Sequence, residues 1–449
     1  MSRQAIVVGL GETGLSCVSY LLGVGYEVLV CDSRPAPALM SSLKERYPQV
    51  PLLLGPFREE VFAATDLLVV SPGVSVKEPA IRAAAKSGVA VVGDIELFVR
   101  VCEAPVIAIT GSNGKSTVTT LVGDMLRRCG LHVEVAGNIG LPVLTLLGRR
   151  PPDVYVLELS SFQLETTRSL NAQAATVLNI TPDHMDRYDD LAEYAHTKAQ
   201  IFAGLGRMVI NREDPWAAAM ARADRETVSF GLDHPTGHDL GLLTHESEVW
   251  LAQGKQRLIL AAAIAISGKH NIANALAAFG LATVMSHDTA AMADALRDFR
   301  GLAHRTQVVA CHDGVYWIDD SKGTNVGATA AALAGLNGPV VLIAGGDGKG
   351  ADFTSLAPIV RDKARAVVLI GRDGPRIEEA LAGCCPIRSA RDMDEAVQIA
   401  SENARPGDQV LLSPACASFD MFRNYAHRGE VFAAAVQRLI LSKAGGAHG

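Results

Sequence analysis

The chain has 449 residues, a formal net charge of −7 at neutral pH and no run of basic residues. It is too long for one hydrophobic core, so we expect two or three domains. The acidic balance argues against nucleic-acid binding, because a basic surface is the usual signature of that function. No apolar run is long enough to cross a bilayer, so we expect no membrane span.

The cysteines and the N-terminus both bear on the compartment. Eight cysteines are scattered without a C-x-x-C pair or zinc-ligand spacing, which is typical of buried reduced thiols. The start, Met1-Ser2-Arg3-Gln4, leads straight into an apolar strand and lacks the regions of a signal peptide. We therefore expect a cytoplasmic protein.

Residues 1–93 alternate strands and helices, which predicts a small Rossmann-like domain. The string Gly9-Leu10-Gly11-Glu12-Thr13-Gly14 follows the first strand, and Asp32 ends the second. This G-x-G-x-x-G fingerprint with an acid ordinarily indicates NAD, because the acid can bind a ribose hydroxyl. Arg34 and the shortness of the domain favour a mononucleotide-like ligand. A tight turn without any ligand is the remaining alternative.

A phosphate cradle is the clearest signal in the middle of the chain. A β-branched run, Val106–Thr110, reads as a buried strand, and Gly111-Ser112-Asn113-Gly114-Lys115-Ser116-Thr117 leads from it into a helix. Glycines let backbone N–H groups surround phosphate oxygens, Lys115 would reach the β/γ-phosphates, and Ser116 would hold Mg²⁺. Ile109 stands where a strict P-loop has its first glycine, so a plain glycine turn before a surface lysine is the alternative.

Polar residues follow later strands of this central region. Glu158 ends a strand, and His184 follows another predicted over residues 175–180. Ligands of open parallel sheets bind at the carboxyl ends of strands, so both residues are placed for metal binding. Strand-end surface groups are the alternative interpretation.

Lys198 falls on the apolar face of a helix predicted over residues 191–202. It could be an exposed amine that reaches water past an apolar stem. It could instead be a buried lysine with a lowered pKa. A neutral amine can react with CO₂ to give a carbamate, which is a carboxylate-like metal ligand, and the residues alone leave both interpretations open.

A third α/β unit is predicted from residue 304 onward, with polar loops at its strand ends. Asp319-Asp320-Ser321-Lys322 follows one strand, Gly345-Gly346-Asp347-Gly348-Lys349 another, and Ser413-Pro414-Ala415-Cys416-Ala417-Ser418 a third. Before this unit, Asn271 and Asn274 lie three apart at the start of an alanine-rich helix. They could read a base edge or cap the helix.

Together these segments resemble the Mur ligases of peptidoglycan synthesis, nearly end to end. The resemblance is carried, in order, by GLGETGLSC, GDIELF, ITGSNGKSTVTTL, GNIGLP, LELSSFQLE, DHMDRY, the Lys198 helix, GKHNIANALAA, GLAHR, DDSKGTN, GGDGKGADF and SPACASFDMF. It implies three α/β domains: a UDP-binding Rossmann-like domain over 1–93, a central P-loop-type ATPase domain with a mostly parallel sheet over 94–303, and a Rossmann-like, amino-acid-binding C-terminal domain over 304–449.

The activity that the resemblance implies is ATP-dependent amide formation between UDP-N-acetylmuramoyl-L-alanine and D-glutamate. The sugar-peptide carboxylate attacks the γ-phosphate of ATP, and the amine of D-glutamate then displaces phosphate from the acyl phosphate. Two Mg²⁺ ions neutralise charge as the phosphoryl group moves. The expected partners are these small molecules alone, and the expected protein is a monomer.

Site residues follow from the resemblance position by position. The ATP site comprises Gly111, Ser112, Asn113, Gly114, Lys115, Ser116, Thr117, Asn271, Arg305 and Asp320. The metal ligands are Ser116, Glu158, His184 and a carbamylated Lys198, and the catalytic residues are Lys115, His184 and Lys198. The UDP-sugar site comprises Gly14, Leu15, Asp32, Arg34, Ser71, Pro72, Gly73, Asn138 and Gln163. The D-glutamate site comprises Lys322, Thr324, Lys349, Ser418 and Tyr425.

Two departures and several rival functions accompany this interpretation. Gly323 stands where the family pattern has alanine, and Tyr425 where it more often has phenylalanine. The nearest alternatives are a sister ligase for another amino acid and a folylpolyglutamate synthetase. An NAD-dependent oxidoreductase would leave the second cradle and Lys198 unexplained. A non-catalytic nucleotide-binding protein would not need Glu158, His184 and Lys198 together.

Overall fold

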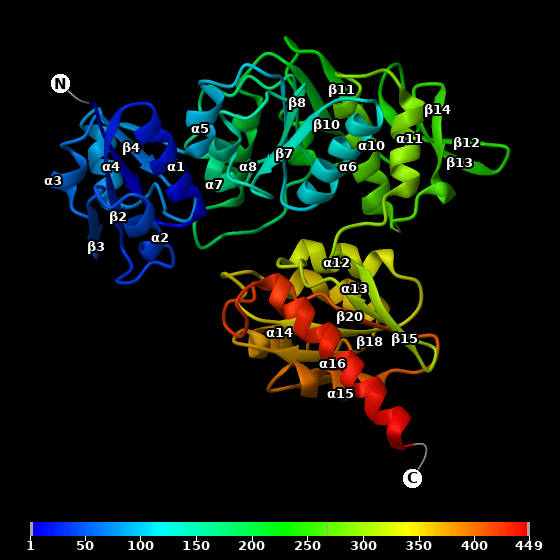
Figure 1. The fold of residues 1–449 in the computed structure, drawn as a ribbon. Helices are drawn as coiled ribbons and strands as arrows, with labels where there is room; N and C mark the ends of the chain where they lie inside the picture. Colours follow the sequence, from blue (N-terminus) through cyan, green and yellow to red (C-terminus); the bar gives the residue numbers. More distant parts are fainter. Residues whose placement is uncertain (1–2, 267, 447–449) are drawn as a thin grey trace. The chain divides into compact units, whose positions relative to one another are not determined.

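The computed structural model describes residues 3–266 and 268–446 (Figure 1). Met1 and Ser2, from the segment expected to lead straight into a strand, lie outside the described residues. Two compact units are formed, one by Met1–Ile180, Ala192–Ala261 and Asn274–Arg297, the other by Thr181–Leu191, Ala262–Ala273 and Asp298–Gly449. Within the described residues, no helix is both long and apolar enough to cross a membrane.

The first sheet has five parallel strands in the order β3-β2-β1-β4-β5. Its strands are β1 (Arg3–Val8), β2 (Tyr26–Asp32), β3 (Leu52–Leu54), β4 (Leu67–Val70) and β5 (Ala90–Val92). The helices are α1 (Glu12–Gly23), α2 (Met40–Arg46), α3 (Glu59–Phe62) and α4 (Pro79–Lys86). Apolar residues of α3 and α4 pack against β1 and β4. The order confirms a Rossmann-like sheet, although sequence analysis missed the short strand β3.

The second sheet has nine strands in the order β14-β13-β12-β11-β10-β9-β6-β8-β7. Its strands are β6 (Val106–Thr110), β7 (Val133–Gly137), β8 (Val154–Glu158), β9 (Ala174–Val177), β10 (Arg207–Asn211), β11 (Thr227–Phe230), β12 (Leu240–His245), β13 (Glu248–Gln253) and β14 (Gln256–Leu260). Pairing is parallel from β7 to β12 and antiparallel from β12 to β14. The mostly parallel central sheet is therefore confirmed.

The helices of this region begin with α5 and end with α11. They are α5 (Asp94–Val99), α6 (Lys115–Arg128), η1 (Val143–Leu146), α7 (Ser161–Leu164), α8 (Leu191–Ala199), η2 (Gln200–Phe202), α9 (Pro215–Ala218), η3 (Ala261–Ala263), α10 (Lys269–Ala282) and α11 (Thr289–Asp298). The single helix predicted over residues 191–202 is thus α8 followed by the 3₁₀ turn η2. The strand predicted over residues 175–180 ends at Val177, which leaves Leu178 to Ile180 as a loop.

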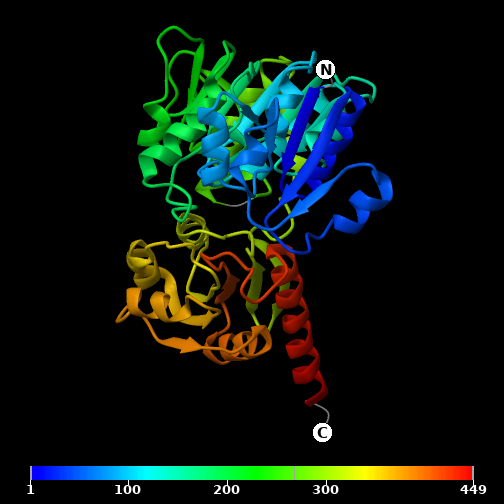
Figure 2. The same cartoon turned by 90° about the vertical axis from the view of Figure 1, so that its left-hand side faces the viewer.

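The third sheet has six strands in the order β15-β16-β20-β17-β18-β19, with β15 antiparallel at one edge. Its strands are β15 (Gln307–His312), β16 (Val315–Asp319), β17 (Val340–Gly345), β18 (Ala364–Ile370), β19 (Ile387–Ser389) and β20 (Gln409–Leu412). The helices are α12 (Val326–Gly335), η4 (Thr354–Leu356), α13 (Ala357–Lys363), α14 (Gly374–Ala380), α15 (Met393–Asn403) and α16 (Tyr425–Gly446). Helix α16, red in Figure 2, packs with α15 on one face, and α12, α13 and α14 pack on the other.

Polar contacts within one unit fix α5 inside the central region and join the first sheet's domain to that region. Glu96 of α5 is 2% exposed and accepts hydrogen bonds from the N–H groups of Arg168 and Ser169 at 2.7 and 2.9 Å. Burial acts to raise the pKa of Glu96, but these and further hydrogen bonds outweigh it, and the net effect lowers the pKa. Lys77 also pairs with Glu193 of α8 at 2.8 Å. Three sheets therefore occur in the three predicted regions, while the boundaries at 93 and 303 stay predictions.

Gly14 offers a test of the first βα turn. A Cβ at Gly14 would lie 2.0 Å from the Gly9 carbonyl oxygen, and backbone atoms cannot give way cheaply. We expect Gly14→Ala to destabilise the protein by at least about 3 kcal/mol. Gly23→Ala is the control, because it lies in the same helix with no heavy atom within 4 Å of its added Cβ. Urea unfolding measures both variants, and equal midpoints would contradict the close approach.

Candidate active site

Predicted functional residues of the central sheet gather at one edge, where neighbouring parallel strands end. The strands β6, β7, β8 and β9 are adjacent and parallel, so their carboxyl ends share that edge. The cradle follows β6, Asn138 follows β7, and Glu158 ends β8. The structure therefore brings together the predicted phosphate loop, one predicted sugar-peptide contact and one predicted metal ligand.

Glycine makes the conformation of the cradle possible. Gly114, directly before α6, has a φ of +85°, a left-handed value that L side chains rarely adopt. A Cβ at this position would lie 2.5 Å from Oδ1 of Asn274. Only glycine fits this position, because any other residue would meet both a steric clash and an unfavourable φ. The N–H groups at the start of α6 can therefore bind an anion in the loop.

Asn179, which sequence reasoning missed, anchors the cradle from the end of β9. Its Oδ1 accepts from the Asn113 N–H at 2.8 Å, and its Nδ2 donates to the Asn113 carbonyl at 3.1 Å. Its own carbonyl accepts from the Ser112 N–H at 2.9 Å. A polar residue after an apolar run could have indicated this anchor. The strand was instead predicted to continue through residue 180, so Asn179 was placed inside it.

Two lysine amines approach one carbonyl oxygen of the cradle. Lys115 Nζ donates to the carbonyls of Gly111 and Ser112, at 2.9 Å each. Lys198 Nζ donates to the Gly111 carbonyl at 3.0 Å and to Thr110 Oγ1 at 3.2 Å. Lys198 is 1% exposed. The interpretation of Lys198 as an amine that reaches water is therefore wrong, whereas its carbamylation stays a prediction.

Glu158 is a buried carboxylate that uses only one of its oxygens. The residue is 1% exposed, and its Oε1 accepts from Asn138 Nδ2 at 2.7 Å. Its Oε2 is buried without a hydrogen-bond partner among the described residues. An unpaired anionic oxygen is costly to bury, and a hard cation such as Mg²⁺ would satisfy it. The residues present therefore fit a magnesium ion.

The predicted metal ligands are of mixed residue types and, among the residues described, do not form a cluster of His, Cys, Asp and Glu side chains. In the described part of the chain, no three or more His, Cys, Asp or Glu side chains group so as to hold a metal ion. The predicted set of Ser116, Glu158, His184 and Lys198 contains only two residues of those types. It stays a prediction.

At the corresponding edge of the first sheet, Asp32 and Arg34 form a network with the glycine loop. Asp32 is 2% exposed; its Oδ2 accepts from the Leu10 N–H at 2.7 Å and its Oδ1 from Arg34 Nε at 2.9 Å. Burial acts to raise the pKa of Asp32, but the hydrogen bonds from Arg34 and Leu10 outweigh it and lower the pKa to about 2. Both oxygens therefore hold the glycine loop and Arg34 in place, and the nucleotide that binds this edge stays a prediction.

Other residues predicted for the UDP-sugar site lie around this network or in the central sheet. Gly14 and Leu15 lie in the first turn of α1. Ser71, which precedes Pro72 and Gly73 after β4, donates its hydroxyl to the Gly9 carbonyl at 2.9 Å. Gln163 of α7 is 3% exposed, and its Oε1 accepts from the Ser160 N–H at 3.0 Å. In this structure the Gln163 side chain caps its own helix. Its predicted contact with the sugar-peptide stays a prediction.

Residues predicted to bind D-glutamate lie at the carboxyl edge of the third sheet. Lys322 and Thr324 follow β16, and the Lys322 amine lies 3.8 Å from the ring centroid of Tyr425, at the start of α16. Lys349 follows β17, and Ser418 follows β20. An isolated β-bridge between Asp347 and Ala417 joins these two loops. The structure therefore brings these loops together, while their ligand stays a prediction.

Asp183 is a second residue that sequence reasoning missed. Its carboxylate pairs with the Lys349 amine and accepts from Asn325 Nδ2 at 3.1 Å. His184 Nε2 lies 3.8 Å from Oδ2 of Asp183. His184 and Lys349 have φ values of +59° and +51°, and such strained backbone clusters at functional sites. His184 thus lies beside the Lys349 network, and its metal role stays a prediction.

Three predicted ATP contacts lie in the same unit as these residues. Asp320 is 8% exposed, and burial raises its pKa to about 6, although a hydrogen bond from Ser413 and the charge of Arg305 oppose the rise. Asn271 and Asn274 are the third and sixth residues of α10. Both asparagines lie in the first two turns of the helix, and whether they cap it or read a base edge stays a prediction. Contacts of Asn271, Arg305 and Asp320 with ATP stay predictions.

Comparison with known families matches three consecutive stretches of the chain. They correspond to a MurD-like N-terminal domain of Mur ligases over 3–93, a Mur ligase middle domain over 109–282, and a Mur ligase glutamate ligase domain over 304–416. The chain belongs to the Mur ligase family.

Similar proteins cover this Mur ligase almost completely. It is 54% identical over 441 residues to a UDP-N-acetylmuramoylalanine–D-glutamate ligase of Methylobacillus flagellatus, with 97% of each chain covered. It is 52% identical over 436 residues to a ligase of the same name from Methylococcus capsulatus, covering 97% of this chain and 95% of that one. The solved MurF ligase of Thermotoga maritima in complex with ADP has a TM-score of 0.63 at 15% identity, covering 98% of this chain and 96% of that one. That likeness supports the fold alone.

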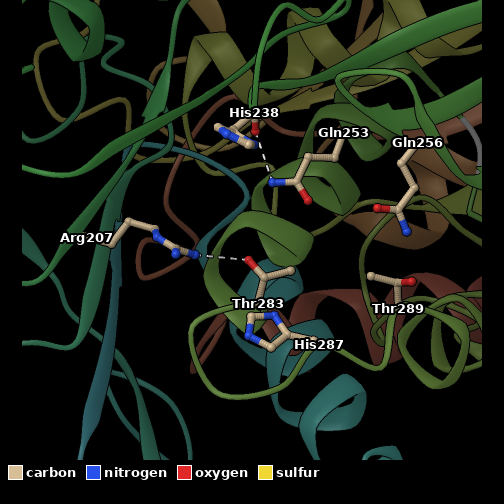
Figure 3. A pocket seen from close by; sticks show the side chains of 7 residues that line it. All are labelled: Arg207, His238, Gln253, Gln256, Thr283, His287 and Thr289. Atoms are coloured by element: carbon tan, nitrogen blue, oxygen red, sulfur yellow. Dashed lines mark hydrogen bonds between the residues drawn. The ribbon is translucent and has the colours of Figure 1, made fainter.

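A separate hollow of the Mur ligase, about 290 Å³ in volume, lies at β10, β13, β14 and the loops around α11 (Figure 3). It is lined by Arg207, His238, Gln253, Gln256, Thr283, His287 and Thr289. Arg207 donates to Thr283 Oγ1 at 3.2 Å and pairs with Glu226 at 2.7 Å. No lining residue belongs to the predicted site, and the arginine already has partners.

Asn179 gives the cradle of this Mur ligase a direct test. Asn179→Ala removes both side-chain bonds to Asn113, which should lower the affinity for magnesium-ADP about tenfold. Asn211→Ala is the control, because Asn211 Nδ2 bonds the Leu178 carbonyl at 2.8 Å but not the cradle. Titration calorimetry measures both, and an unchanged affinity in Asn179→Ala would contradict the anchoring role.

Proposed function

We propose that this Mur ligase joins D-glutamate to UDP-N-acetylmuramoyl-L-alanine, with hydrolysis of ATP to ADP, in peptidoglycan precursor synthesis. The proposal rests on sequence identity: nearly the whole chain is 54% and 52% identical to two proteins named UDP-N-acetylmuramoylalanine–D-glutamate ligase. Polar loops at the carboxyl edges of all three sheets support it, since such edges are where open parallel sheets bind ligands.

The chemistry requires an activated carboxylate, because a carboxylate does not condense with an amine unaided at neutral pH. In the proposed reaction, the sugar-peptide carboxylate attacks the γ-phosphorus of ATP and ADP leaves. The amine of D-glutamate then attacks the acyl carbon, and phosphate leaves with the bonding electrons. Lys115 and the backbone N–H groups of the cradle would hold the ATP phosphates, and Asn271, Arg305 and Asp320 would add further ATP contacts.

Magnesium would be held by Ser116 and Glu158, with His184 and carbamylated Lys198 serving a second ion. The ion supplies neutralisation of phosphate charge when bound. The free Oε2 of Glu158 supports the first of these roles.

Two observations support the carbamate on Lys198. The amine is buried, and it shares the Gly111 carbonyl with the Lys115 amine. A buried amine is more easily held in its neutral form than an exposed one, because burial disfavours the charged form. A neutral amine adds to CO₂ by forming an N–C bond and losing one proton. The product offers oxygens, the ligands that Mg²⁺ prefers.

D-Glutamate would bind the loops after β16, β17 and β20. Its carboxylates need local cationic donors because the whole chain is acidic. Lys322 and Lys349 supply amines, and Thr324 and Ser418 supply hydroxyls. The UDP-sugar would bind at the edge that carries Gly14, Asp32, Arg34 and Ser71. Because nucleotide-activated precursors and ATP are cytoplasmic metabolites, we place the reaction in the cytoplasm.

The amino-acid substrate separates this proposal from a sister ligase. Phosphate release should require UDP-N-acetylmuramoyl-L-alanine, magnesium-ATP and D-glutamate together. We expect kcat/KM for D-glutamate to exceed that for L-glutamate, L-lysine or meso-diaminopimelate at least about 100-fold, because a wrong substrate leaves buried polar groups unpaired. A faster rate with one of these other amino acids would assign the chain to a different ligase. A change in nicotinamide absorbance would support the oxidoreductase.

Lys198 variants test the carbamate. Lys198→Ala should lose about 1,000-fold in kcat, because the metal loses an oxygen ligand, and acetate should restore part of the activity. Lys198→Arg should be inactive and not rescued, since its permanent charge fills the space. Phosphate release is the measurement. Wild-type activity of Lys198→Arg would exclude a carbamate ligand.

A further inference from the structure

Arg428, in the first turn of α16, is a buried cation outside the residues assigned so far. It is 0% exposed and is the largest of the fully buried side chains. Burial lowers its pKa to about 10, so the guanidinium keeps its charge at neutral pH. A buried charge is costly unless hydrogen bonds compensate it. The acceptors of the Arg428 guanidinium N–H groups therefore show what this side chain stabilises.

The donors of Arg428 reach two strand-end loops. Nε donates to Ser321 Oγ at 3.0 Å, and Nη2 donates to the Ser321 carbonyl at 2.8 Å, both after β16. Nη1 donates to the carbonyls of Cys416 and Ala417, after β20, at 3.1 and 3.4 Å. Among the described residues, none of these acceptors is a carboxylate. The guanidinium therefore serves as a fork between two stretches of backbone.

A third loop and the start of α16 are tied to the same fork. The Ala417 N–H donates to the Asp347 carbonyl at 2.8 Å, and the Asp347 N–H donates back at 3.0 Å. Ser321 Oγ donates to the Tyr425 carbonyl at 2.7 Å. Gly346 packs so closely that a Cβ there would lie 3.4 Å from Arg428 Nη1. One side chain thus stands beneath the loops that carry Lys322, Lys349 and Ser418.

We propose that Arg428 is a positioning residue that holds the loops after β16, β17 and β20 in the geometry that binds the amino-acid substrate. It acts through Ser321, Cys416 and Ala417 without touching that substrate. The inference rests on the proposed function, because the substrate of these loops is the D-glutamate assigned there. Arginine is required because five donors in one rigid plane bond several carbonyls at once, whereas a lysine amine cannot span both loops.

The test separates substrate positioning from general stability. In Arg428→Met, KM for D-glutamate should rise about 30-fold, while KM for ATP and for the UDP-sugar stays within about threefold. Arg428→Lys keeps the charge without the fork and should show an intermediate rise of about tenfold. Arg438→Met is the control on the same helix, because Arg438 is exposed and pairs only with Asp394 in the described structure.

Ser321→Ala covers the case in which Arg428→Met does not fold. It removes one acceptor and the bond to Tyr425 but leaves the carbonyl contacts of the guanidinium, so KM for D-glutamate should rise about threefold to tenfold. An unchanged KM in Arg428→Lys and Ser321→Ala would overturn the proposal. An equal rise of all three KM values with a lowered melting temperature would also overturn it, since that is a structural role. Absence of D-glutamate-dependent phosphate release in the wild type would instead refute the proposed function.

Discussion

The proposed chemistry depends on two lysine amines that share one carbonyl oxygen. Lys115 and Lys198 both donate to Gly111, and Lys198 is buried beneath the cradle. On the strand next to the cradle strand, Glu158 keeps one buried oxygen without a partner. The buried Oε2 of Glu158 is costly to leave without a partner in a medium of low dielectric. A magnesium ion on Glu158 would satisfy that oxygen, and a carbamate on Lys198 would offer oxygen ligands from the cradle side.

The same architectural rule operates in all three sheets. Parallel strands end at a common edge, and the loops at that edge carry polar residues that neighbouring side chains hold in place. Asp32 and Arg34 hold the first glycine loop, Asn179 holds the cradle, and Arg428 holds the loops of the third sheet. These anchors bond mainly to backbone. The shape of these loops therefore depends on the anchors and not on the side chains predicted to bind substrate.

Most of the fold was predictable, because long apolar strands and glycine turns are local signals. The short strands β3 and β19 were missed, since three residues carry too little periodicity, and the six-residue edge strand β15 was missed as well. The sequence left Lys198 either buried or exposed, because only tertiary packing decides whether its side of the helix faces the protein interior. Asn179, Asp183 and Arg428 were not predictable as anchors, because the fold and not the local sequence brings Asn113, Lys349 and Ser321 to them. An arginine within a helix reads as a surface residue until its carbonyl acceptors are known.

The central claim is that the Lys198 amine is converted to a carbamate. Carbon-13 NMR of the protein in ¹³C-bicarbonate at neutral pH tests it most directly, with Lys198→Gln as the matched control. We expect a carbamate carbon resonance in the wild type that is absent from Lys198→Gln and disappears on acidification, since an acidified carbamate returns CO₂ and a protonated amine. Identical spectra of the two proteins, under conditions where the wild type is active, would contradict the account.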